Sequence, residues 1–281
     1  GEKAFRGCDA AILAVPPGVA RELAPRAWAE GCLAVDLSGA FRGEADVPLV
    51  VAGLNDADVA AGAARGVVAS PSGAVVPLAL ALAPLHRAAG VTRVVATMLV
   101  AASASGRAGV RQLEREMVSL LGGEEPDPSE LSHRMGFNVV PQVGTFGPGG
   151  TTDEEAAVEV QLRRLLGAPA LAVSATAVRV PVFYGHTLVL NVATDRPLDA
   201  EGARAALRAS PELKVIDAPA ERVYPMPMLS VNDDAVLVGR VRADPSRAGG
   251  LDLVVVADNL RRGAAANAVR IAQEWAARRG A

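Results

Sequence analysis

The sequence has few aromatic residues and no excess of positive charge. Aromatic residues make up 3% of its 281 residues, and the formal net charge is −3. A nucleic-acid-binding surface needs a basic stripe and rings that stack on bases, so we expect no nucleic-acid partner. Hydrophobic residues make up 51% of the chain, which is enough to form a large buried core. We therefore expect a globular protein.

Cysteine is also scarce, with only Cys8 and Cys32 present. Two cysteines form neither a disulfide framework nor a cysteine-rich metal site, and we expect no metal. Each adjoins a short apolar run, so we expect both to be buried structural thiols. No apolar signal segment precedes Cys8, which favours a cytoplasmic location. The one long uncharged run, residues 66–85, contains three prolines, so we predict a buried strand, a tight turn and a buried helix there and no membrane span.

The first residues predict part of a nucleotide-binding unit. An apolar run at 8–15, a helical pattern at 19–30 and an apolar run at 33–35 give the strand, helix and strand of a parallel, doubly wound sheet. Ligands collect at the carboxyl ends of such strands. No G-x-G-x-x-G turn for a dinucleotide pyrophosphate lies between a strand and a helix, so we expect this sequence to start partway through the unit.

The rest of the chain predicts a second, mixed domain. Helical patterns occur at 78–89, 108–121 and 153–166, and strand patterns at 91–99, 170–194, 213–217 and 235–241. A strand at 253–257 and a helix at 262–279 look like a return to the first domain. The predicted fold class is therefore α/β plus α+β. A partial Rossmann-like domain comprises residues 1–72 and 253–281, and a mixed-sheet dimerisation or substrate domain comprises 73–252.

Three histidines occur, and each has a different expected role. His86, near the end of a predicted helix, is expected to be a helix-end cation. His133 is expected at the solvated end of a polar insertion at 122–132. His186 lies seven residues after Arg179 in a segment rich in β-branched residues. We interpret that segment as one strand, bent near Pro181 or Gly185, because only a bend would bring the two side chains together. The alternative is a plain edge strand with a solvated arginine and a packed histidine.

Five motifs, in order along the chain, are similar to those of aspartate-semialdehyde dehydrogenases. They lie at residues 36–42, 136–142, 178–186, 239–242 and 256–267. Residues 16–18 and 36–42 also resemble the N-acetylglutamyl-phosphate reductases, which share the architecture, but the final helix and the 179–186 segment favour the first family. That family reduces an aspartyl phosphate to the semialdehyde with NADPH, through a thioester on a cysteine. The resemblance implies NADP as cofactor, an acyl phosphate or aldehyde as small-molecule substrate, and a homodimer.

The resemblance also implies roles for individual residues. Arg179 would hold the substrate carboxylate, and His186 would be the acid/base. Arg42 would meet the phosphate, helped by Arg164 where the family has a lysine. Three further residues would lie beside the nicotinamide: Ser103, Ala104 and Asn259.

The sequence departs from the family pattern at the reacting centre. Gly73 aligns with the nucleophilic cysteine, and glycine has no side chain to carry a thioester. Val100 aligns with a substrate-orienting glutamine, and Gln161 with a glutamate. Pro77 would kink the helix after Gly73 or move its start forward. A nearby serine, Ser70 or Ser72, could replace the thiol, but capping the helix is the favoured use of either hydroxyl.

Three functional hypotheses stay open. The first is a catalytically impaired family member that keeps the dimer scaffold and an anion pocket from Arg42, Arg164 and Arg179. The second is an active NAD(P)-dependent reductase of a related acyl phosphate or aldehyde, in which His186 alone handles the proton. The third is a non-catalytic dimerisation partner of a genuine dehydrogenase. Arg179 and His186 could also be inherited packing residues without a ligand. The glycine at position 73 favours the first hypothesis.

Overall fold

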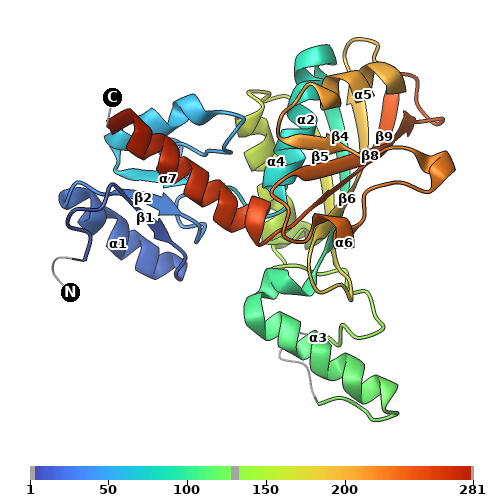
Figure 1. The fold of residues 1–281 in the computed structure, drawn as a ribbon, viewed down its shortest axis with the longest axis horizontal. Coiled ribbons are helices and arrows are strands. Elements are labelled where there is room, and N and C mark those ends of the chain that lie inside the picture. The colour runs from blue at the N-terminus through green and yellow to red at the C-terminus, as the bar shows by residue number, and fades with distance from the viewer. Residues whose placement is uncertain (1–3, 128–132, 280–281) are drawn as a thin grey trace.

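The computed structural model describes residues 4–127 and 133–279, which form two sheets that lie side by side (Figure 1). The first sheet is parallel and has three strands in the order β1 (Ala10–Leu13), β2 (Leu33–Asp36) and β3 (Val67–Ala69). α1 (Pro17–Ala29) connects β1 to β2, which confirms the predicted strand–helix–strand unit. Between β2 and β3 the chain forms the 3₁₀ helix η1 (Asp56–Ala64).

Two helices cover the opposite faces of the first sheet because its side chains alternate. On one face Ala34 packs with Ala20 and Ala24 of α1. On the other face Leu33 packs with Ile271 of α7 (Ala266–Arg279), the last helix of the chain. α7 therefore covers one face of the first sheet, although it follows all strands of the second sheet in sequence (Figure 1).

The second sheet is mixed and has six strands. From edge to edge they are β5 (Ala172–Arg179), β4 (Val91–Val100), β6 (His186–Thr194), β9 (Gly250–Ala257), β8 (Val236–Ala243) and β7 (Leu213–Val215). Its core-forming face packs against three helices: α2 (Val75–Ala89), α4 (Asp153–Leu165) and α5 (Ala200–Arg208). α3 (Gly106–Leu121) projects away from both sheets, and the short helix α6 (Pro227–Ser230) lies near β9 (Figure 1). No helix in the described ranges is long and apolar enough to cross a membrane.

The strand predicted at 253–257 is β9, and it does not belong to the first sheet. It pairs with β6 and β8 in the second sheet, so the prediction of a first-domain strand is wrong. Only the helix after it returns to the first sheet. A local run of valines predicts a strand, but it does not determine which other strands will pair with that strand.

Arg179 and His186 lie on two strands, so the predicted single bent strand is also wrong. Arg179 ends β5, which is parallel to β4, and His186 begins β6, which pairs antiparallel with the other edge of β4. The connection crosses the end of β4, where Ala102 N–H donates to Val182 O at 2.8 Å. Gly185 has φ +84°, a left-handed conformation that favours glycine in this crossing.

Several local predictions can be compared directly with the structure. Pro77 lies in the first turn of α2, where a missing N–H is tolerated, and it does not move the helix start beyond Val75. His86 lies in the last turn of α2, as predicted, and its Nδ1 accepts a hydrogen bond from Val91 N–H at 3.0 Å. Cys32 is buried as predicted, but Cys8 is exposed because it precedes β1.

The predicted polar insertion is described only in part. His133 is exposed, as expected for its solvated end. Residues 128–132 of the insertion lie outside the described ranges.

Candidate functional site

A cleft of about 290 Å³ lies between the turn before α2, the start of β6 and the segment before α7. It brings together eight of the residues singled out in the sequence: Arg42, Ser72, Gly73, Val100, Ser103, Ala104, His186 and Asn259. Two further lining residues are Leu37 after β2 and Glu154 on α4. The described residues contain no group of three or more His, Cys, Asp or Glu side chains that could hold a metal ion.

Gly73 leaves open space at the start of α2. A Cβ built on it would lie 3.9 Å from Gly263 O and 4.0 Å from Asn259 O, which is ordinary contact. Neither nearby serine caps the helix, contrary to expectation, because the Ser70 hydroxyl accepts from Asn267 and the helix has no side-chain cap. The Ser72 hydroxyl is buried and has no hydrogen-bond partner in the described structure.

His186 is held in one tautomer beside this turn. Its side chain is 4% exposed, and Nδ1 accepts a hydrogen bond from Ala101 N–H at 3.2 Å. The proton of the neutral ring is therefore on Nε2. Burial lowers the pKa of His186 to about 4, although the carboxylate of Asp258 opposes the shift. A group that exchanges protons efficiently near neutrality needs a pKa near 7, so His186 is a weak base here.

Asn259 joins the second sheet to the segment before α7. Its Oδ1 accepts hydrogen bonds from the Ser103 hydroxyl and from Gly185 N–H, each at 3.1 Å. Ser103 N–H in turn donates to Phe183 O at 3.0 Å. These contacts fix the short 3₁₀ helix η2 (Ala102–Ser105), which carries Ser103 and Ala104 into the cleft.

Arg42 and Glu154 place opposite charges in the same cleft. The Arg42 guanidinium donates to Ser70 O at 2.7 Å and to Leu37 O at 2.9 Å. Burial lowers its pKa, while Glu154 and Asp36 act in the opposite direction. Sequence reasoning missed Glu154 because an acidic residue in the first turn of a helix is expected from the helix dipole alone. No local signal distinguishes it from Glu155, which completes a capping box with Thr152.

The other two arginines do not line this cleft. Arg164 donates to the backbone oxygens of Glu44 and Val47 and so fixes the loop that follows Arg42. Arg179 is half-buried, and its Nη1 donates to the Ser105 hydroxyl at 2.6 Å. Burial lowers the pKa of Arg179, and within the described ranges no carboxylate forms an ion pair with it. The expected pocket of three arginines is therefore not assembled around the cleft.

Known proteins share this architecture and much of this sequence. A family model for the semialdehyde dehydrogenase dimerisation domain matches residues 82–262, and one for the semialdehyde dehydrogenase NAD binding domain matches residues 1–62. Aspartate-semialdehyde dehydrogenase of Aquifex aeolicus is 36% identical over 97% of this chain and 80% of its own length. This chain belongs to the aspartate-semialdehyde dehydrogenase family. The enzyme of Mycolicibacterium smegmatis is 37% identical over 96% of this chain and 82% of its own length.

Solved structures of aspartate-semialdehyde dehydrogenases agree with the fold. Aspartate semialdehyde dehydrogenase II of Vibrio cholerae, in complex with ASA, superposes with a TM-score of 0.92 at 33% identity. The match covers 95% of this chain and 79% of that one. The predicted family and the predicted combination of a Rossmann-like parallel sheet with a mixed-sheet domain are thus confirmed.

Proposed function

We propose that this chain is an aspartate-semialdehyde dehydrogenase family member that has lost the covalent step of the reaction. The supporting observation is Gly73, which lines the cleft at the start of α2 where the resemblance places the nucleophilic cysteine. Without a side chain at this position, an acyl group has no sulfur to which it can be transferred. The alternative is an active reductase in which His186 alone handles the proton, and NADPH formation by the unmodified chain would support it.

The cleft keeps the means to bind a small molecule. The Arg42 guanidinium suits an anionic group, and the Glu154 carboxylate suits an ammonium group. We therefore propose that the ligand carries both charges, as an amino acid semialdehyde does. Arg179 and Arg164 contribute indirectly, since their guanidinium groups hold the loops at 101–105 and 42–47.

Nicotinamide binding is proposed for the same cleft. A volume of about 290 Å³ is near the lower end for ligand pockets, so it suits one ring and not a whole dinucleotide. Ser103, Ala104 and Asn259 would hold that ring of NADP, and a bound nicotinamide would supply hydride-transfer chemistry. Titration of the purified protein with NADP, followed by calorimetry, measures whether the cofactor binds.

The decisive experiment compares the chain with its Gly73→Cys variant. Each is incubated with aspartate semialdehyde, NADP and phosphate, and both NADPH formation and adduct mass are recorded. We expect no turnover and no adduct from the unmodified chain, and an adduct at position 73 in the variant. Turnover by the unmodified chain comparable with that of the Aquifex aeolicus enzyme would refute the proposal.

A second proposed role, association through the six-stranded sheet, is favoured by one observation. The face of this sheet opposite α2, α4 and α5 is partly exposed, and Val189 on the inner strand β6 is 41% exposed. Its neighbours on the adjacent strands, Thr97 and Val254, are only half-buried. We propose that this face forms a homodimer, or a mixed dimer with a genuine dehydrogenase. Purification from cells that express both chains would distinguish the two.

A further inference from the structure

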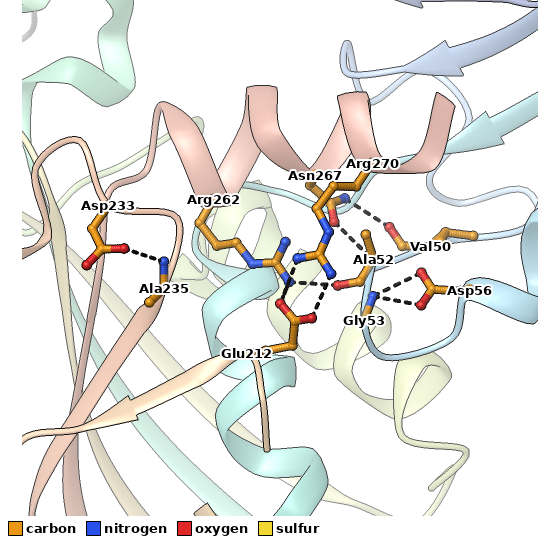
Figure 2. A network of polar contacts seen from close by, with 10 residues as sticks. All are labelled: Val50, Ala52, Gly53, Asp56, Glu212, Asp233, Ala235, Arg262, Asn267 and Arg270. Carbon is orange, nitrogen blue, oxygen red and sulfur yellow. Dashed lines mark hydrogen bonds and ion pairs between the residues drawn. The ribbon is translucent and has the colours of Figure 1, made fainter. Parts of the chain in front are cut away.

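Glu212 connects the second sheet to the first (Figure 2). It lies just before β7 and accepts hydrogen bonds from two arginines of the returning segment. Arg270 on α7 donates to both of its carboxylate oxygens, at 2.6 Å each. Arg262 lies in the π-helical turn Arg261–Ala265 that leads into α7, and it donates to Oε2 at 2.6 Å through Nη2. One carboxylate thus holds two guanidinium groups of a segment that otherwise packs on the other sheet.

A glycine in the first part of the molecule makes room for this carboxylate. Gly53 has φ +83°, and a Cβ built on it would lie 2.3 Å from Glu212 Oε1 and 2.5 Å from its Cδ. No real Cβ approaches that closely, so a side chain at position 53 would displace Glu212. Figure 2 shows Glu212 beside the loop that contains Ala52 and Gly53.

Arg262 depends on Glu212 for its charge balance. Its side chain is completely buried, and Nη2 also donates to Ala52 O at 2.7 Å. Nε and Nη1 have no hydrogen-bond partner in the described structure. Burial lowers the pKa of Arg262, and Glu212 opposes that shift more than the other nearby carboxylates, Asp234 and Asp56. A buried guanidinium that loses its hydrogen-bonded carboxylate partner is strongly destabilised. Removal of the Glu212 charge would therefore push Arg262, and the turn that carries it, out of the present position.

The turn that carries Arg262 is also a wall of the cleft. Asn259, Leu260 and Gly263 line the cleft, and Gly263 lies directly against Gly73. A Cβ built on Gly263 would be only 2.6 Å from Gly73 O, so the two backbones touch. Movement of the turn at 259–264 thus changes the cleft beside position 73.

We propose that Glu212 is a positioning residue for the cleft: by holding Arg262 and Arg270 it fixes the turn at 259–264 against the turn at 70–73. The inference rests on the cleft being the ligand site of the proposed function, but it does not require turnover or any particular ligand. Glu212 acts through the two arginines, since it does not line the cleft itself.

A thiol introduced at position 73 reports on this geometry. The parent for all variants carries Cys8→Ser and Gly73→Cys, because Cys8 is exposed whereas Cys32 is buried. The rate of alkylation by iodoacetamide at position 73 is followed by mass spectrometry. Glu212→Gln in this parent is expected to raise that rate about tenfold or more, which corresponds to about 1.4 kcal/mol in the local opening equilibrium.

The matched control is another carboxylate bound to an arginine. Asp217 has a side chain that is 1% exposed and accepts from Arg204 Nε at 2.7 Å, but it does not line the cleft. Asp217→Asn should lower the global stability and leave the alkylation rate within about twofold of the parent. Equal rates for the Glu212→Gln and Asp217→Asn variants would overturn the proposal, since a purely structural ion pair gives that result.

A steric variant tests the same point without removing a charge. Gly53→Ala should displace Glu212 and accelerate alkylation in the same direction as Glu212→Gln. Gly31→Ala is its control, because Gly31 has φ +79° and nothing within 4 Å of its built Cβ. It therefore carries similar backbone strain without the collision. If the Glu212→Gln variant does not fold, Arg270→Gln replaces it, because Arg270 is a half-exposed partner of Glu212. An unchanged alkylation rate in both Arg270→Gln and Gly53→Ala would also refute the proposal.

Discussion

The side-chain amide of Asn267 donates a hydrogen bond of 2.9 Å to the hydroxyl of Ser70, which lies 197 residues earlier in the chain. Asn267 is completely buried on α7, and it also donates to Val50 O at 3.1 Å and accepts from Ala52 N–H at 2.8 Å. One side chain therefore connects α7 to the loop after β2, as Figure 2 shows. It also connects α7 to the turn beside the cleft through Ser70.

Truncation of Asn267 is expected to be costly. Asn267→Ala leaves buried backbone and hydroxyl groups without partners, and we expect the free energy of unfolding in urea to fall by roughly 3 kcal/mol. Asn138→Ala is the control, because Asn138 is exposed, and its effect should stay within about 0.5 kcal/mol. Similar losses of unfolding free energy in the two variants would contradict the prediction that the hydrogen bonds of Asn267 stabilise the fold.

Two glycines whose backbones touch, Gly73 and Gly263, should differ in how much stability they lose on substitution by alanine. Gly73→Ala places its Cβ only in ordinary contact with Gly263 O and Asn259 O, so we expect the free energy of unfolding to change by less than about 1 kcal/mol. Gly263→Ala places its Cβ 2.6 Å from Gly73 O, and we expect a loss of about 1–3 kcal/mol. Thermal and urea unfolding of the two variants measure the difference. A larger loss for Gly73→Ala would show that the space at position 73 is not open.

The buried imidazole of His186 should make stability depend on pH. Its pKa is about 4 in the folded protein and 6.5 in the unfolded chain, so the unfolded state binds more protons between these values. The free energy of unfolding should therefore fall as the pH drops from 6.5 to 4, by roughly 3 kcal/mol from this group. His186→Gln should remove that part of the pH dependence. Titration of the ring by NMR checks the pKa directly, and a value above 6 would contradict the prediction.

The proposed dimer face can be tested with two equally exposed valines. Val189 on β6 and Val19 on α1 are each 41% exposed. Val189→Lys would bury a charge at the proposed interface, so we expect the molar mass by light scattering to fall from a dimer to a monomer. Val19→Lys should leave the mass unchanged. A dimer that persists in the Val189→Lys variant would exclude this face as the interface.

Much of the fold follows from local patterns in the sequence. The helix at 108–121 and the strand at 91–99 were predictable because their apolar residues recur with the period of a helix or a strand. The partner strands of β9 and the separation of Arg179 from His186 onto two strands were not predictable. They depend on which segments meet across the sheet, and the local hydrophobic pattern is compatible with several pairings.

The candidate site was predictable only where a whole motif surrounds it. Gly73, His186 and Asn259 belong to motifs or turns whose positions are set by neighbouring strands, and the structure brings them into one cleft. The contacts of Arg164 were not predictable, because a guanidinium on a helix can reach backbone oxygens as well as a ligand. Glu154 was not predicted, because an acidic residue in the first turn of a helix is already explained by the helix dipole.

The return of α7 to the first sheet has a consequence for biosynthesis. Because Ile271 and Trp275 supply apolar surface that Leu33 and Val35 need, the early strands emerge from the ribosome long before their covering helix exists. Their valine-rich face must stay shielded by a chaperone or by transient contacts until residues 266–279 have also been translated. Ribosomes stalled before residue 266 should therefore carry nascent chains whose first sheet is sensitive to protease.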